Sequence, residues 1–390
     1  MIKRTLQARV REAAKHFPVL TITGPRQSGK TTLCRMTFPS KSYVSLEAPD
    51  VREFATQDPR GFLAEHGSGC ILDEVQRAPS LLSYLQELVD SDPRPGRFVL
   101  TGSANFALLE SVSQSLAGRT AVLQLLPLDR EETRRFPRFP KDLFTTLWTG
   151  GYPAVFDRAV PVRDWYGSYV ATYLERDVRR LVNVSDLVTF QTFLRICAGR
   201  SGQLLNLSGL GADCGITHNT ARAWFSVLET SYLVFRLPPY HANVTSRAVK
   251  RPKMHFADTG LLCYLLGIET PDQIRRHPLR GAIFESWVCS EVLKARLHRG
   301  LPSNLFFYRD RKGLEVDLLL RKGDRIIAVE AKSGETIAPD FTANLDRLAR
   351  RMSDSAEALN KVVVYGGLQG QRRSGATVLG WEQAGGSRWI

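Results

Sequence analysis

Short apolar runs, separated by segments long enough to form helices, organise the first 130 residues. These runs cover residues 18–23, 42–46, 69–72, 97–100 and 120–125. Five such runs with helical crossovers predict five strands of a doubly wound parallel sheet. Ligands of such a sheet bind at the edge formed by the carboxyl ends of its strands. We therefore expect a ligand site among the residues that directly follow these runs.

The middle of the chain has a helical pattern. Residues 140–200 are mostly helical, and residues 169–181 alternate apolar and charged positions at helical spacing. Two further helix candidates, 204–210 and 216–230, are joined by a glycine-containing turn and followed by a strand at 232–237. This order predicts a winged helix-turn-helix. A module that only contacts protein, or that extends a helical lid, is the alternative.

The last third of the chain turns from helix to strand. Residues 281–293 predict an amphipathic helix. Residues 313–320 and 325–332 predict two strands joined by a turn at 321–324. We therefore expect a second α/β domain after the helical middle section.

Composition narrows the class of protein. The 390 residues are 43% hydrophobic and 24% charged, which is typical of globular proteins. The 53 Lys and Arg residues exceed the 39 Asp and Glu residues and give a net charge of +14, which favours a polyanionic partner, either nucleic acid or an acidic membrane surface. The six cysteines are scattered and form no CxxC pair, so neither a zinc ribbon nor a disulfide framework is expected.

The chain begins with a polar, amphipathic segment, and it contains no run of about 18 apolar residues. We therefore expect a cytoplasmic protein with no membrane partner.

A phosphate-binding loop follows the first apolar run. The eight residues from Gly24 to Thr31 read GPRQSGKT and match the template G-x-x-x-x-G-K-[ST] without departure. In such a loop successive backbone N–H groups surround a phosphate, and the next helix directs its positive end at the anion. Lys30 is expected to reach the β- and γ-phosphates, and Thr31 to hold Mg²⁺. The expected nucleotide contacts are Gly24, Pro25, Arg26, Gln27, Ser28, Gly29, Lys30, Thr31 and Thr32.

Acidic and polar residues end two of the other runs. Asp73 and Glu74 close the third run, where Asp73 would orient Mg²⁺ and Glu74 would activate the attacking water. Ser103 and Asn105 follow the fourth run and are candidates for sensing the γ-phosphate. A plain turn is the alternative for these last two residues.

The order of phosphate loop, acidic strand end and polar-ended strand resembles an AAA+ ATPase. The resemblance implies ATP and Mg²⁺ as cofactors and a homo-oligomeric ring, with a hexamer favoured. It also implies that Arg119, just before the fifth strand, reaches the ATP of a neighbouring subunit. The alternative is that Gly118 and Arg119 simply end a helix, where glycine and a cation are common.

Two groups of residues are candidates for contacts with DNA. Thr217, Asn219 and Arg222 would lie on the exposed face of the second helix of the helix-turn-helix, which can enter a major groove. Lys250, Arg251 and Lys253 belong to a basic segment suited to phosphate contacts. A solvated loop is the alternative for the second group.

The last domain carries acids in a pattern that suits a metal site. Glu330 and Lys332 share one face of a strand, and Asp317 on the neighbouring strand can join them. Two carboxylates and a lysine make a Mg²⁺ site that can stabilise a metal-activated hydroxide. The arrangement resembles the PD-(D/E)xK endonuclease fold, which places Asp317, Glu330 and Lys332 at catalytic positions and Glu285 as the acid of the helix. A nuclease-like scaffold kept for DNA binding or assembly is the alternative.

The whole chain, with YLERDVR, FADTGL and VEAK, resembles predicted prokaryotic ATPases that fuse an AAA+ module to a PD-(D/E)xK nuclease-like domain. The resemblance implies an ATPase that acts on DNA as a motor or switch, for instance on branched DNA, with a metal-dependent nuclease site. A nucleotide-controlled regulator with a silent scaffold, or a nuclease licensed by ATP, are the alternatives. The expected domains are an AAA+ core (1–135), a helical lid (136–200), a winged helix-turn-helix (201–245) and the nuclease-like domain (246–390).

Overall fold

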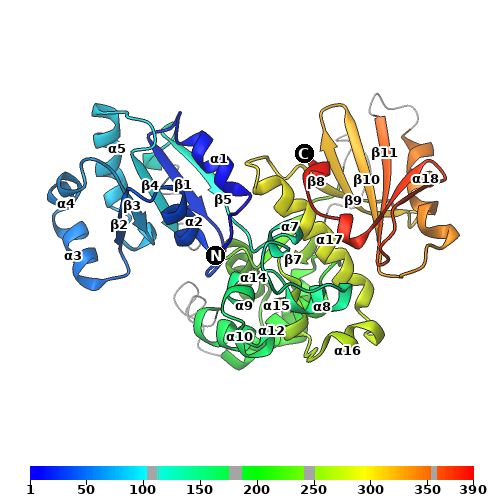
Figure 1. Cartoon of the computed structure of the whole chain (residues 1–390). Helices are drawn as coiled ribbons and strands as arrows, with labels where there is room; N and C mark the ends of the chain where they lie inside the picture. Colours follow the sequence, from blue (N-terminus) through cyan, green and yellow to red (C-terminus); the bar gives the residue numbers. More distant parts are fainter. Residues whose placement is uncertain (103–111, 113, 175–186, 241–250, 353–357) are drawn as a thin grey trace. The chain divides into compact units, whose positions relative to one another are not determined.

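The computed structural model describes residues 1–102, 112, 114–174, 187–240, 251–352 and 358–390 (Figure 1). By its contacts the chain divides into two units. The first is residues 1–127 with the short segments 230–232 and 297–301, and the second contains the remaining residues. The domain boundaries expected within the second unit remain a prediction.

The first unit contains the five expected strands. They form one parallel sheet in the order β2-β3-β4-β1-β5. Strand β4 therefore lies between β1, which the phosphate-binding loop follows, and β3, which ends in Asp73. The strands are β1 (Val19–Thr23), β2 (Ser42–Ser45), β3 (Cys70–Asp73), β4 (Phe98–Gly102) and β5 (Thr120–Gln124). The helices are α1 (Leu6–Ala13), α2 (Lys30–Thr37), α3 (Pro49–Gln57), α4 (Pro59–Glu65), the 3-10 turn η1 (Val75–Arg77) and α5 (Leu81–Ser91).

Two hydrophobic cores cover the two faces of this sheet. Alternate residues of one strand supply both, as Ile71 of β3 packs with α1 and α2, whereas Cys70 and Leu72 pack with α3, α4 and α5. Burial on both faces explains why the strands read as continuous apolar runs. The doubly wound parallel sheet predicted from the sequence is confirmed.

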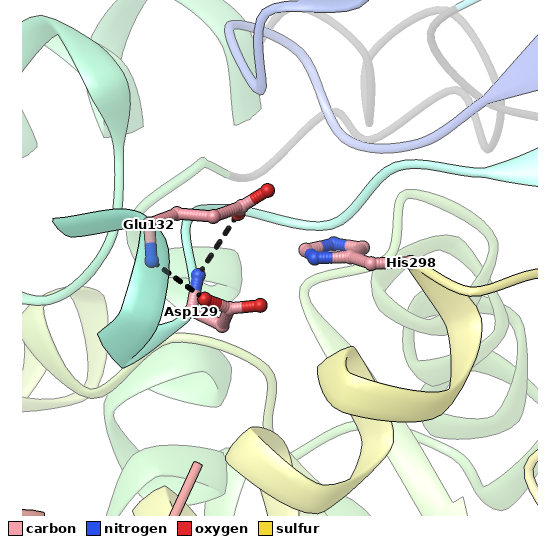
Figure 2. Close-up of side chains that lie close together, drawn as sticks. All are labelled: Asp129, Glu132 and His298. Carbon is pink, nitrogen blue, oxygen red and sulfur yellow. Dashed lines mark hydrogen bonds between the residues drawn. The ribbon is translucent and has the colours of Figure 1, made fainter. Parts of the chain in front are cut away.

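The second unit begins with helices. Its first helix, α7, starts with reciprocal hydrogen bonds in which the Glu132 N–H donates to Asp129 Oδ1 at 2.8 Å and the Asp129 N–H donates to Glu132 Oε2 at 3.2 Å (Figure 2). The helices are α7 (Arg130–Thr133), α8 (Leu143–Thr149), α9 (Pro153–Asp157), α10 (Val162–Tyr169), the π-helical turn η2 (Val170–Leu174), α12 (Leu187–Gly199), α13 (Leu207–Cys214), α14 (His218–Thr230), α15 (Thr259–Leu265) and α16 (Pro271–Arg276).

A helix–turn–helix is followed by a two-stranded antiparallel ribbon. Helices α13 and α14 are joined through Gly215, whose φ of +67° suits glycine, and the ribbon pairs β6 (Val234–Leu237) with β7 (Lys253–Phe256). The first helix begins later than predicted because Leu204 bridges to Lys253 as extended chain.

The last part of the chain forms a mixed six-stranded sheet in the order β12-β13-β11-β10-β9-β8 (Figure 1). Helix α18 packs against one face through Leu345 and Leu348. The strands are β8 (Leu305–Arg309), β9 (Glu315–Lys322), β10 (Arg325–Lys332), β11 (Ala358–Tyr365), β12 (Gln371–Arg373) and β13 (Ala376–Gly380). The helices are α17 (Arg280–Leu297), α18 (Ala343–Arg351) and the 3-10 turns η3 (Pro339–Thr342), η4 (Trp381–Gln383) and η5 (Ser387–Trp389).

The prediction that the helix at 281–293 is amphipathic is wrong. Helix α17 is buried along most of its length, polar residues included. Those residues have partners, since Ser290 Oγ donates to the Ala257 carbonyl at 2.6 Å and Arg296 Nη1 donates to the Trp389 carbonyl at 2.9 Å. Among the described residues, no helix is both long and apolar enough to cross a membrane.

Candidate functional site

The phosphate-binding loop joins β1 to α2 and needs two glycines for steric reasons. Gly24 has a φ of +148°, and a Cβ there would lie 2.1 Å from the Leu125 carbonyl oxygen. Gly29 has a φ of +93° directly before the first turn of α2. Both conformations disfavour residues with a Cβ. The loop predicted from the sequence therefore has the backbone that its glycines permit.

Lys30 opens α2 and is folded back over this loop. Its Nζ donates to the carbonyl oxygens of Gly24 at 3.0 Å and Pro25 at 2.8 Å. Burial lowers the pKa of Lys30 to about 8, although Glu74 and Asp73 act in the opposite direction. The ammonium therefore lies in a poorly solvated position where a phosphate would be a strong partner.

Asp73 ends β3 and accepts hydrogen bonds from three hydroxyl groups. Thr31 Oγ1 donates to both of its carboxylate oxygens, at 3.1 and 3.0 Å, and Tyr43 Oη donates to Oδ2 at 2.7 Å. Thr101 Oγ1 donates to Oδ1. Burial, reinforced by Asp73, raises the pKa of Tyr43 to about 12, so Tyr43 is a donor at neutral pH. The predicted pair of Thr31 and Asp73 is thus in direct contact.

Glu74 follows Asp73 at the carboxyl edge of the sheet. Its backbone is left-handed, with a φ of +58°, and its Oε2 accepts a hydrogen bond from Gln76 Nε2 at 2.5 Å. The negative charge of Glu74 also acts on Lys30, where it partly opposes the lowering of the Lys30 pKa by burial. The structure therefore brings Lys30, Thr31, Asp73 and Glu74 together at one edge of the sheet, and their roles remain a prediction.

Sequence reasoning missed Tyr43, Gln76 and Thr101. Thr101 had a signal, because it ends β4 beside β3 at the edge where a ligand is expected. Tyr43 had none, because its contact with Asp73 depends on the pairing of β2 with β3.

The other residues expected at the nucleotide differ in position. Ser28 is buried, Arg26 is half-buried, and Gln27 and Thr32 are exposed. Ser103 and Asn105 lie outside the described residues.

Arg119 lies directly before β5, as expected. Its guanidinium forms an ion pair with Asp90 of α5, with Nε–Oδ1 and Nη2–Oδ2 distances of 2.5 and 2.8 Å. Thr120 pairs with Val19, the first residue of β1, whereas the phosphate loop follows the last. Arg119 is therefore at the opposite edge of the sheet from the loop of its own subunit.

The residues expected to contact DNA are only partly exposed. Thr217, Asn219 and Arg222 are exposed on and beside α14, and Arg251 is exposed as well. Lys250 lies outside the described residues. The expectation for Lys253 is wrong, because Lys253 is a buried residue of β7 and not part of a solvated basic loop.

The Lys253 ammonium instead lies among carboxylates of the last domain. Its Nζ is 2.7 Å from Glu285 Oε1, 2.5 Å from Glu315 Oε1 and 4.0 Å from Asp317 Oδ1. Burial lowers the pKa of Lys253, but these three acids together raise it above its usual value. Glu315 was not predicted, although it lies two residues before Asp317 on the same face of β9.

The predicted acids and lysine of this domain do come together. Lys332 Nζ is 2.6 Å from Glu330 Oε2, and the N–H of Ala331 donates to Asp317 Oδ2 at 2.9 Å. Burial, reinforced by Asp317, raises the pKa of Glu330 to about 8 and that of Glu285 to about 8. We refer to Lys253, Glu285, Glu315, Asp317, Glu330 and Lys332 as the acidic cluster.

Family models match three consecutive parts of the chain. Residues 16–134 match an AAA domain. Residues 140–272 and 280–383 match two domains of unknown function, DUF8612 and DUF4143. The first unit is therefore an AAA-type P-loop module, in agreement with its loop and sheet.

Two curated relatives match most of the chain. They are the uncharacterized proteins Rv2008c of Mycobacterium tuberculosis and Mb2031c of Mycobacterium bovis. Each is 34% identical over 343 residues, which cover 86% of this chain and 74% of the relative. The chain belongs to the family of these two proteins. The family therefore joins the AAA-type module to the domains that follow it.

Solved structures with detectable similarity include P-loop proteins. The Walker-type ATPase PABY2304 of Pyrococcus abyssi is 15% identical, with 67% of this chain and 94% of that chain covered and a TM-score of 0.47. The AMPPCP-bound DnaA of Aquifex aeolicus is 12% identical, with 57% and 86% covered and a TM-score of 0.30.

Proposed function

We propose that this protein hydrolyses ATP to ADP and phosphate and uses the reaction as a switch, or a motor, that acts on DNA. The observation that supports this most directly is the contact of Thr31 with Asp73 beside Lys30 and Glu74. These four residues supply a cation for phosphate, a hydroxyl and a carboxylate for a metal, and a second carboxylate for a water.

The phosphate loop has unsatisfied capacity for an anion. Ser28 Oγ is buried and has no hydrogen-bond partner among the described residues. A buried polar group without a partner is costly, and a phosphate oxygen would satisfy it. Lys30 can exchange its two loop carbonyls for phosphate oxygens, which would stabilise its charged form.

A hydroxyl and a carboxylate are the oxygen donors that Mg²⁺ prefers, so Thr31 and Asp73 fit this ion. When bound, Mg²⁺ would neutralise charge on the phosphates. Glu74 is the general base of the proposal, because its carboxylate can accept the proton of the attacking water.

ATP turnover by three variants tests this assignment. Lys30→Ala removes the cation and should abolish ATP turnover and weaken ATP binding. Glu74→Gln should retain ATP binding but reduce turnover by about 10²-fold or more, because an amide cannot accept the proton. Glu53→Gln makes the same chemical change on the exposed surface of α3 and serves as the matched control. Wild-type turnover by Glu74→Gln would refute the role of Glu74.

A second proposed activity is DNA binding by the helix–turn–helix. Helix α14 buries Trp224 and Leu228 and exposes Asn219 and Arg222 near its start, and an antiparallel ribbon follows it. These features support a winged helix-turn-helix whose second helix enters a major groove. Arg251, at the end of the segment before β7, suits a phosphate contact.

Assembly into a homo-oligomer is part of the proposal. Arg119 precedes β5 at the sheet edge away from its own phosphate loop, so a role in hydrolysis requires the nucleotide of another subunit. The AAA+ resemblance favours a hexameric ring. Within that ring, ATP would bind between subunits, and hydrolysis would move the DNA-binding parts.

We assign the last domain to the PD-(D/E)xK nuclease-like fold. The order α17-β8-β9-β10-α18-β11, with β10 antiparallel to β9 and parallel to β11, supports this assignment. So does the position of Asp317, Glu330 and Lys332 on adjacent strands, with Glu285 on α17. Whether this domain cleaves DNA depends on whether its acidic cluster binds a divalent metal ion, which requires a separate test.

A further inference from the structure

The nuclease-like fold implies a divalent metal ion held by Asp317 and Glu330. Mg²⁺ and Mn²⁺ need several oxygen ligands at about 2.1 Å, and these oxygens must be free to approach the ion. In the acidic cluster one oxygen of each carboxylate already has a partner, while the buried Glu330 Oε1 has no hydrogen-bond partner among the described residues. Asp317 Oδ2 accepts the N–H of Ala331, and Glu330 Oε2 pairs with Lys332. Because one oxygen of each carboxylate is engaged, a divalent ion would have to displace the Ala331 N–H or the Lys332 ammonium to use both oxygens of either acid.

Lys253 is a second reason why the acidic cluster does not suit a divalent ion. Its ammonium lies 2.7 Å from Glu285, 2.5 Å from Glu315 and 4.0 Å from Asp317, which is where a cation would sit among the acids. We propose that the Lys253 ammonium replaces the divalent cation, so that the acidic cluster is a metal-free structural site and not a nuclease centre. This inference is independent of ATP hydrolysis.

The charge of the cluster supports the replacement. The four carboxylates of Glu285, Glu315, Asp317 and Glu330 face three cations, because Arg309 Nη1 also lies 3.3 Å from Glu315 Oε2. Fully ionised, the group carries a net charge of −1. Without the Lys253 ammonium the net charge would be −2, which is the charge that one divalent ion neutralises. The Lys253 ammonium thus supplies part of the positive charge that a divalent ion would otherwise bring to these acids.

The backbone holds Lys253 in this position. Lys253 pairs with Leu237 across the ribbon and bridges to Leu204, so its strand is held on both sides. Its side chain is only 2% exposed, and its Nζ lies 5.6 Å from the centre of the Phe307 ring. A long lysine without such constraints could turn to solvent, but this one is enclosed with its acids.

Mn²⁺ binding to the full-length, nucleotide-free protein tests the replacement, measured by the loss of the free-ion paramagnetic resonance signal. The wild type should have no Mn²⁺ site that depends on Asp317, so Mn²⁺ binding should be the same in the wild type and in Asp317→Asn. Lys253→Met, which is unbranched, one atom shorter and uncharged, should acquire a site at least about tenfold tighter than any in the wild type. Lys253→Arg keeps the charge and is the matched control, in which no site should appear.

Three results overturn the proposal. The first is a stoichiometric Mn²⁺ site in the wild type that is lost in Asp317→Asn. The second is a folded Lys253→Met protein, judged by its circular dichroism spectrum, that gains no site. If Lys253→Met does not fold, Lys253→Gln replaces it, and failure of both leaves the wild-type titration to decide. The third is Mn²⁺-dependent cleavage of linear, single-stranded or branched DNA that Asp317→Asn abolishes.

Discussion

Single residues of the nucleotide site combine burial with charge. Lys30 is enclosed by its own loop, and burial lowers its pKa to about 8 in the absence of nucleotide. Lys30 is therefore mostly protonated at pH 7 and mostly neutral at pH 9. A neutral amine attracts phosphate less, so ATP affinity is linked to the proton on Lys30.

The affinity for ATP should fall as the pH rises through about 8. Between pH 7 and 9 the dissociation constant should increase by up to about tenfold, because Lys30 must first take up a proton that phosphate then retains. Titration of a fluorescent ATP analogue across this range measures the change. Residual binding by Lys30→Ala should lack this step. An affinity that is constant from pH 7 to 9 would contradict the proton linkage.

The sequence could predict Lys30, Thr31, Asp73 and Glu74, because each lies at a fixed spacing from a strand end. It could not predict that Tyr43 donates to Asp73 or that Lys253 enters the acidic cluster. Both contacts join residues that are far apart in the chain, as Lys253 and Glu315 are. Such contacts depend on which strands are neighbours in the fold. The charge pattern around Lys253 instead resembled a basic segment suited to phosphate contacts.

The burial of helices and strands agrees with their hydrophobic patterns where the buried residues are mostly apolar. The three central strands of the first sheet, β1, β3 and β4, are buried along their whole length, and they were predicted from their apolar runs. Helix α17 was not predicted as a buried helix, because polar residues such as Ser290 are typical of a solvent-exposed face, although Ser290 Oγ donates to the Ala257 carbonyl. Helix α14 agreed with its pattern, with Trp224 inside and Asn219 outside.

DNA binding through α14 and the segment before β7 should depend steeply on salt. The double variant Arg222→Ala with Arg251→Ala should lower the slope of log K against log salt by at least about 0.9, the amount expected for the lost phosphate contact of Arg251. Fluorescence anisotropy of a labelled duplex at several salt concentrations measures this slope. Arg347→Ala with Arg373→Ala removes two exposed arginines of the last domain and is the control. An unchanged slope in the first double variant would place the DNA surface elsewhere.

We propose that the whole molecule acts as an oligomer, and substitution of Arg119 tests this proposal. Arg119 pairs with Asp90 in its own subunit, and a role at a neighbouring nucleotide would require it to leave this partner. Arg119→Ala should reduce turnover by about 10³-fold. Mixing it with Lys30→Ala should restore part of the activity, because some interfaces then combine an intact loop with an intact arginine.

The control for the mixing experiment is the double variant Lys30→Ala with Arg119→Ala. Mixed with either single variant, it offers no interface in which both residues are intact, and it should restore nothing. A mixture of the two single variants that is as inactive as each alone would exclude a role of Arg119 between subunits.

The net charge of +14 and the exposed residues of α14 are the features from which we propose a polyanion as the partner of the ATPase. If DNA is the substrate of the switch, occupancy of the DNA-binding parts should change the rate at which the AAA-type module turns over ATP. Such coupling follows from reciprocal linkage between the two binding events. It separates a protein that acts on DNA from a regulator that responds to ATP alone.

The most direct test is therefore the steady-state rate of ATP hydrolysis without DNA and with duplex, single-stranded or four-way DNA at one low salt concentration. At least one form of DNA should raise the wild-type rate several-fold, and the double variant Arg222→Ala with Arg251→Ala should lose that increase while keeping its basal rate. A wild-type rate that is the same with every form of DNA would contradict the account.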